Sequence, residues 1–222
     1  MNIAYCGLSV KGNPEQAELA RLIQDNTTKI IYCIGNAGTG KTIVSLAAAI
    51  EDVEINKKYG KRGKIYYVRE PVEVGKSLGY LPGGIDEKFD AYLEGLRDNL
   101  IKLEDIGGMI KAENELEKIE CIPPQYLRGA SKDQCIIIVD EAQNMSLNTI
   151  KTILTRVGDY TKVVLLGSTN QIDTKGITKK DNDFMKTYNK LKDLNYVGFV
   201  ELIQSKRSAF CAEIDARLSE DE

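Results

Sequence analysis

The chain has no histidine in its 222 residues, and its five cysteines are an odd number without a C-x-x-C pair. Without imidazole, the Ser-His and Cys-His schemes of nucleophilic catalysis are excluded. A zinc site built from cysteine and histidine, or a framework of disulfides, has no support either. Cys33 and Cys135 lie inside apolar runs, and we expect them to be small core residues.

Long hydrophobic runs are also lacking, and no stretch approaches the length of a membrane span. The first ten residues do not combine a basic start with an apolar stretch, so they are not typical of a signal peptide. We therefore expect a protein of the reducing cytoplasm with no membrane partner.

An excess of positive charge is missing too, because the formal net charge is −3. No overall field points to a nucleic-acid partner, so such a contact would need a local patch. One basic cluster can form that patch, and a solvated loop after a helix is the alternative interpretation. The cluster consists of Lys57, Lys58, Lys61, Arg62 and Lys64.

Short apolar, β-branched runs predict buried strands, and helical patterns lie between most of them. The predicted strands are residues 29–34, 64–69, 135–140, 162–167 and 197–203. The predicted helices are residues 14–24, 41–51, 85–103 and 147–157. This alternation predicts an α/β fold, a mostly parallel sheet covered by helices on both faces. The length suits one domain over residues 1–222, with an acidic tail at about 218–222 that we expect to be disordered.

Two regions do not fit the simple alternation. Residues 69–81 are rich in glycine, proline and charge and predict a long loop. Residues 106–128 combine an acidic helical piece, residues 111–120, with a proline-containing segment. With the helix between them, they predict a small insertion ahead of the strand at 135–140, which can form a subsidiary lobe.

One motif matches the phosphate-binding pattern G-x-x-x-x-G-K-[ST] at every fixed position. It reads Gly35-Asn36-Ala37-Gly38-Thr39-Gly40-Lys41-Thr42, between a predicted strand and a predicted helix. Glycines let successive N–H groups turn toward phosphate oxygens, and the helix N-terminus adds positive charge. Lys41 would neutralise the β- and γ-phosphates, and Thr42 would bind Mg²⁺. A glycine-rich turn without a ligand needs neither side chain, so the motif predicts binding of ATP with Mg²⁺.

The strand at residues 135–140 ends in two carboxylates, Asp140 and Glu141. A strand end can direct Asp140 toward the metal, usually through water. Glu141 then follows where it can polarise the attacking water. The alternative is that the two carboxylates cap the next helix. The phosphate-binding motif upstream favours the metal-and-base interpretation.

A third element, Leu165-Leu166-Gly167-Ser168-Thr169-Asn170-Gln171, places polar groups after an apolar strand. In a parallel sheet such groups face the ligand crevice. Gln171 is a candidate contact to the γ-phosphate or the attacking water, and an ordinary turn is the alternative.

A fourth element, Asn13-Pro14-Glu15-Gln16, allows two interpretations. Asn13 can be the N-cap of a helix, with Pro14 at its first position and Gln16 closing a capping box. Alternatively, the Gln16 amide can read the edge of adenine. One side chain cannot serve fully in both roles, so local physics leaves the choice open.

The four elements, in this order, resemble superfamily 1 helicase-type P-loop proteins, and the stretches between them resemble one branch, the PhoH-like ATPases. The resemblance runs from about residue 13 to residue 217. The stretches that carry it are Arg69-Glu70-Pro71-Val72-Glu73-Val74-Gly75, Leu78-Gly79-Tyr80-Leu81-Pro82-Gly83, Glu87-Lys88-Phe89-Asp90-Ala91-Tyr92-Leu93, Tyr126-Leu127-Arg128-Gly129, Asp140-Glu141-Ala142-Gln143-Asn144, Leu154-Thr155-Arg156-Val157-Gly158 and Gln171-Ile172-Asp173.

The resemblance implies a P-loop NTPase (RecA-like) core, assembly of protomers into rings that can be hexamers, and a link to RNA. By position it implies that Gln16 reads adenine and that Arg207 acts as an arginine finger, for its own site or a neighbour's. Arg128 and Arg156 are the other candidates for the finger. The chain departs from the family pattern at Ser168 and Ser208, which bears on coupling more than on ATP binding.

These observations predict an ATPase that uses Mg²⁺ and is coupled to RNA or single-stranded DNA. The alternative is a nucleotide-gated oligomeric scaffold with weak ATPase activity that binds protein partners. A small-molecule phosphotransferase is disfavoured, because no arginine-rich lid for a second phosphorylated substrate is evident.

Overall fold

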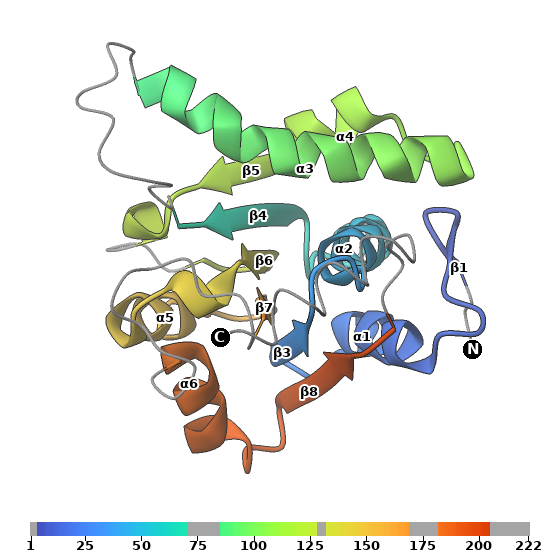
Figure 1. Cartoon of the computed structure of the whole chain (residues 1–222). Coiled ribbons are helices and arrows are strands. Elements are labelled where there is room, and N and C mark those ends of the chain that lie inside the picture. Colours follow the sequence, from blue (N-terminus) through green and yellow to red (C-terminus); the bar gives the residue numbers. More distant parts are fainter. Residues whose placement is uncertain (1–3, 71–84, 128–131, 169–181, 205–222) are drawn as a thin grey trace, which may run out of the picture.

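A computed structural model describes residues 4–70, 85–127, 132–168 and 182–204 of the chain. Its centre is a six-stranded sheet with the order β5-β4-β6-β7-β3-β8 (Figure 1). Each neighbouring pair of strands is parallel. The strands are β3 (Ile30–Gly35), β4 (Lys64–Arg69), β5 (Ile119–Ile122), β6 (Cys135–Asp140), β7 (Lys162–Gly167) and β8 (Val197–Leu202).

Parallel pairing brings the carboxyl ends of neighbouring strands to the same edge of the sheet. β3, which leads into the glycine-rich motif, lies between β7 and β8. β7 separates it from β6, which ends in Asp140. The ends of β3, β7 and β6 are therefore adjacent, where open α/β sheets bind ligands. This confirms the predicted RecA-like α/β fold.

Helices cover both faces of the sheet (Figure 1). Two separate clusters of buried apolar residues lie between the helices and the sheet. Residues of α1, α2 and α3 pack on one face, and residues of α5 and α6 pack on the other. The helices are α1 (Pro14–Gln24), α2 (Lys41–Lys57), α3 (Ile85–Gly107), α4 (Ala112–Lys118), α5 (Leu147–Leu154) and α6 (Asp183–Leu191).

The insertion between β4 and β6 extends the main body of the domain instead of forming a subsidiary lobe. Its strand β5 pairs with β4 and widens the sheet. Leu96, Leu100 and Leu103 of α3 are fully buried in the same core as α1 and α2. The predicted helix 111–120 is correct only as far as Lys118, because the chain enters β5 at Ile119.

Other element boundaries differ more modestly from the predictions. Helix α2 continues to Lys57, beyond the predicted end at residue 51, and α5 ends at Leu154 rather than 157. The sequence patterns did not predict helix α6 or the small antiparallel pair β1 (Ala4–Tyr5) and β2 (Leu8–Ser9).

The described cysteines are free, and Cys33 and Cys135 are buried core residues as predicted. Burial raises the pKa of the Cys33 thiol to about 12 and that of Cys135 to about 11, so both are inert at neutral pH. Within the described ranges, none of the helices has the length and apolar character needed to cross a bilayer.

Candidate active site

The glycine-rich motif forms the turn between β3 and α2. β3 ends at Gly35, and α2 begins at Lys41 with Gly40 as its N-cap. Gly40 has no side chain that could accept from the first helical N–H groups, and no side-chain cap forms there. A helix N-terminus without a side-chain cap offers N–H donors and partial positive charge to an anion.

Close packing explains two of the glycines. Gly40 has φ of 90°, in the left-handed region, and a Cβ there would lie 2.7 Å from Nε2 of Gln16. At Gly35 a Cβ would lie 2.6 Å from the carbonyl oxygen of Leu202 on β8. Neither position has room for a side chain, so the turn is fitted tightly between α1 and β8.

The Lys41 ammonium lies over the turn that precedes it. Its Nζ donates to the carbonyl oxygens of Gly35, at 2.6 Å, and Asn36, at 3.0 Å. Thr39 is fully buried, and its hydroxyl donates to the same Asn36 carbonyl at 2.9 Å. These bonds hold the lysine charge beside the backbone cradle, as recognition of phosphate requires.

Thr42 and Asp140 meet although they are 98 residues apart in sequence. The Thr42 hydroxyl lies 3.3 Å from each carboxylate oxygen of Asp140, which is only 6% exposed. Asp140 also accepts from the backbone N–H of Glu141 at 3.1 Å. This hydroxyl and carboxylate link the two motifs.

Tyr67 on β4 is a further partner of Asp140. Its fully buried hydroxyl donates a short hydrogen bond to the Asp140 carboxylate. Burial, and then the neighbouring Asp140 charge, raise the pKa of Tyr67 well above its ordinary value. Tyr67 therefore stays protonated and remains a donor at neutral pH.

The pair formed by Thr42 and Asp140 suits a magnesium ion that is held partly by phosphates and water, rather than a metal held by protein side chains alone. Across the described residues, no group of three or more acidic or cysteine side chains gathers to hold a metal. Mg²⁺ usually keeps several waters and takes one or two protein ligands together with substrate phosphates. A hydroxyl and a carboxylate beside a phosphate-binding turn match that preference.

Glu141 leaves the strand in a strained conformation, with φ of 53° for a residue that is not glycine. Its carboxylate accepts from Nε2 of Gln143 at 2.6 Å. Gln143 is fully buried, and its Oε1 accepts from the backbone N–H of Ser168 at 3.0 Å. One amide thus joins the end of β6 to the end of β7. Glu141 makes no side-chain cap of the following turn, which disfavours the capping interpretation of the two carboxylates.

Gln16 follows only part of the capping-box interpretation. Asn13 is the N-cap of α1, because its side chain accepts from the Gln16 backbone N–H at 3.0 Å. The Gln16 side chain does not close a capping box, and its Nε2 donates instead to the carbonyl oxygen of Thr39 at 2.9 Å. Gln16 is therefore anchored in the phosphate-binding turn. Its role toward adenine remains a prediction.

Several predicted residues fall outside the described part of the chain, namely Gln171, Arg207, Ser208, Arg128 and the acidic tail. Arg156 is described, and its carbonyl accepts from the Lys132 N–H at 3.0 Å, ahead of the start of β6. Because Asp140 is at the other end of β6, Arg156 lies at the opposite edge of the sheet from the site of its own chain.

Sequence reasoning missed two residues of this site, Tyr67 and Gln143. Tyr67 reads as one more apolar position of a buried strand, and its partner is 73 residues away. Gln143 lies within one of the stretches that resemble the family, but the sequence patterns did not indicate a function for its side chain. Its position two residues after Glu141 was the available signal.

Comparison with known proteins supports the family suggested by the motifs. Residues 10–217 match the family described as PhoH-like protein. Protein PhoH2 of Bacillus subtilis is 35% identical over 202 residues, which cover 88% of this chain and 44% of that protein. A PhoH-like protein of the same organism is 36% identical over 178 residues, or 79% of this chain and 53% of that protein.

Among solved structures, the chain matches that of the Aeropyrum pernix ORC2 protein in its ADPNP–ADP complexes. The match has a TM-score of 0.41 and 14% identity, over 94% of this chain and 51% of that one. An overlap of this size adds nothing to the fold described above. The chain spans about half the length of the relatives it matches, at 44% and 53%. With its matching region extending over most of its length, the chain belongs to the PhoH-like protein family.

Proposed function

We propose that this chain binds ATP with Mg²⁺ and hydrolyses the bond to the γ-phosphate. The observation that carries the proposal is the contact of Thr42 with Asp140, at 3.3 Å, beside the uncapped start of α2. It unites a phosphate-binding turn after β3 with a carboxylate at the end of β6, on the same edge of the sheet, which is the arrangement that P-loop hydrolysis requires.

Each side chain has a defined task in this scheme. The backbone N–H groups of residues 35–42 would hold the phosphates, and Lys41 would neutralise their charge. Thr42 and Asp140 would hold Mg²⁺, which supplies positive charge to the phosphate oxygens when bound. Glu141 would polarise the attacking water and take up its proton as the γ-phosphate leaves ADP. Gln171 and Arg207 are proposed to contact the γ-phosphate, and Gln16 the adenine.

Gln143 would act as a positioning residue rather than a catalytic one. It fixes the Glu141 carboxylate through a 2.6 Å bond and joins it to the backbone of Ser168 at 3.0 Å. Gln143→Met removes both bonds at similar volume. It should lower kcat by about tenfold or more while leaving the affinity for ATP unchanged. Gln125→Met, at an exposed position outside the site, is the matched control.

The central test compares Lys41→Ala and Glu141→Gln in binding and turnover. Lys41→Ala should abolish tight binding of Mg·ATP in calorimetry. Glu141→Gln should bind Mg·ATP normally, yet turn over about 10²–10⁴-fold more slowly, the range for loss of a general base. If Glu141→Gln hydrolyses ATP at the wild-type rate, the role given to Glu141 is wrong.

We further propose that hydrolysis is coupled to RNA or single-stranded DNA through a helicase-like core and that protomers assemble into a ring. Family membership supports this proposal. Movement along a strand needs two P-loop units, and a ring of protomers would supply them. ATPase rates with and without single-stranded RNA, at fixed salt, decide the matter. Strong stimulation is expected. A rate that RNA leaves unchanged favours a nucleotide-gated scaffold instead.

A further inference from the structure

A pocket of about 360 Å³ lies at the edge of the sheet opposite the P-loop. The three loops that line it each lead into the amino end of a strand, β3, β4 or β7. This volume is within the range of pockets that hold small organic ligands. Nothing in the ATPase scheme above uses it. Its lining residues are Asn26, Thr28, Lys29, Lys61, Arg62, Asp159, Tyr160 and Thr161.

A buried arginine is the fixed element of the pocket. Arg62 is only 3% exposed, and Asp52 holds its Nε at 2.5 Å and its Nη2 at 2.9 Å. Asn26 accepts from the same Nη2 at 2.8 Å. The third nitrogen, Nη1, makes no hydrogen bond within the part of the chain that the structure describes. The guanidinium is therefore oriented in advance and still has donors for an acceptor in the pocket.

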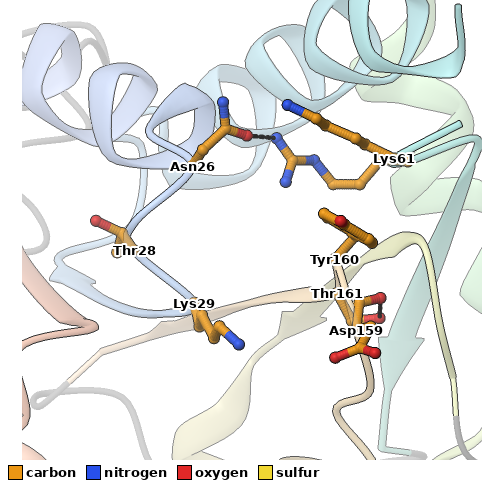
Figure 2. A pocket seen from close by; sticks show the side chains of 8 residues that line it. Asn26, Thr28, Lys29, Lys61, Asp159, Tyr160 and Thr161 are labelled. Atoms are coloured by element: carbon orange, nitrogen blue, oxygen red, sulfur yellow. Dashed lines mark hydrogen bonds between the residues drawn. The ribbon is translucent and has the colours of Figure 1, made fainter. Parts of the chain in front are cut away.

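Two lysines add positive charge to the lining. Lys61 and Lys29 lie on opposite sides of the pocket, above and below it in Figure 2. Neither ammonium group has an ion pair or a hydrogen bond among the described residues. Asp159 is the one carboxylate in the lining, and the Arg62 charge is already matched by Asp52. The free charge in the lining is thus positive and favours an anion.

An aromatic ring stands beside these cations. Tyr160 is 54% exposed, and Figure 2 shows its ring at the side of the pocket, between the two lysines. Its backbone has φ of 56°, in the left-handed region that a tyrosine rarely adopts. Holding a large ring in a strained, exposed position costs stability and often accompanies ligand binding. A ring next to cations suits a ligand with both a planar ring and a phosphate.

We propose that this pocket binds one nucleoside phosphate unit. The base would stack on Tyr160, and the phosphate would take donors from Lys61, Lys29 and Arg62. The unit can be a free mononucleotide or one residue of a single strand, since both present the same ring and phosphate. The proposal goes beyond hydrolysis at the P-loop and does not depend on it.

The test is a calorimetric titration of the full chain with UMP, an octamer of oligouridylate and inorganic phosphate. The P-loop is first saturated with Mg²⁺ and a slowly hydrolysed ATP analogue, so that the ligands report on another site. The same titrations on Lys41→Ala measure the pocket when the P-loop binds nothing. Failure of the ATP proposal and failure of this one are thereby distinguished.

Binding of UMP at one site, more tightly than inorganic phosphate, is the expected result. An octamer that binds more than about eightfold tighter than UMP identifies a strand as the source, because eight units alone give a statistical gain of that size. An octamer that gains no more than this identifies the free mononucleotide. If neither ligand binds better than inorganic phosphate, the proposal is overturned.

Two variants place the ligand in the pocket. Tyr160→Asn removes the ring and suits the left-handed backbone, so folding is preserved. It should weaken the binding of UMP by about tenfold, because the base loses the ring on which it stacks. Lys61→Glu should weaken it by at least as much. Tyr126→Asn and Lys58→Glu, at exposed positions outside the pocket, are the matched controls. Equal losses in variants and controls would also overturn the proposal.

Discussion

The hydroxyl of Tyr67 offers the sharpest test of how the metal-binding carboxylate is supported. Tyr67→Phe removes one oxygen atom from a fully buried side chain and leaves the packing of the ring in place. Asp140 then keeps its contacts with Thr42 and with the Glu141 N–H but loses its shortest hydrogen bond. The variant therefore isolates one interaction at the site.

Two general magnitudes set the size of the effect. A hydrogen bond to a charged acceptor contributes about 1.5–3 kcal/mol to stability. Loss of an outer partner of a metal ligand lowers metal affinity by about 10–100-fold. Because two other donors to Asp140 remain, we expect the lower end of both ranges. Tyr67→Phe should thus lose about 1.5 kcal/mol in the free energy of unfolding and about tenfold in Mg²⁺ affinity.

The assay is the rate of ATP hydrolysis against free Mg²⁺ at saturating ATP, together with urea unfolding monitored by circular dichroism. Tyr66→Phe is the control, because Tyr66 is the preceding residue on β4 and packs into the core cluster on the other face of the sheet. A Mg²⁺ half-saturation within twofold of wild type for Tyr67→Phe would refute the reasoning, whatever happens to stability.

Three further predictions concern residues that support the phosphate-binding turn or the pocket at the opposite edge of the sheet. Burial lowers the pKa of Lys162 from 10.5 to about 7, so the contribution of this side chain to stability is fully present above pH 10.5 and is lost as the pH falls to about 7. The free energy of unfolding of wild type in urea, relative to that of Lys162→Met, should therefore increase between pH 7 and pH 10. Equal pH profiles for the two proteins would contradict this. Gly40→Ala should weaken ATP binding measured by calorimetry, because the new Cβ meets the Gln16 amide at 2.7 Å; Gly12→Ala has a similar positive φ with open space and should not. Asp52→Ala leaves a buried guanidinium without its partner and should cost about 3–5 kcal/mol in the free energy of unfolding, and a loss below about 1 kcal/mol would show that the pair is not desolvated.

The sequence was enough to predict the fold where local pattern and tertiary demand agree. The glycine-rich turn, its flanking strand and helix, and the carboxylates after a run of Ile and Val all follow from short stretches. Strands β4, β6 and β7 have the predicted limits, because each is an apolar run buried on both faces. β5 was missed because its four residues follow a helix directly, without a turn signal.

What the sequence could not supply is the pairing of side chains across long separations. The residues around Tyr67 in the sequence do not indicate that its partner is a carboxylate 73 residues away. Gln16 is a second example. Its backbone N–H donates to the Asn13 cap as predicted, while its side chain donates to the carbonyl oxygen of Thr39, 23 residues further on. Such choices depend on the assembled fold rather than on propensity.

Helix α1 is fastened at both of its ends by side chains that reach the main chain. At its start, Gln16 is bonded to the Thr39 carbonyl of the nucleotide turn. At its end, the Nζ atom of Lys162 lies within hydrogen-bond distance of three carbonyl oxygens, those of Leu22, Ile23 and Asp25, at 2.9, 2.6 and 2.6 Å. Eleven residues make a rod about 16 Å long. The helix therefore ties the nucleotide turn at one edge of the sheet to the segment at the opposite edge whose Asn26 and Thr28 line the second pocket.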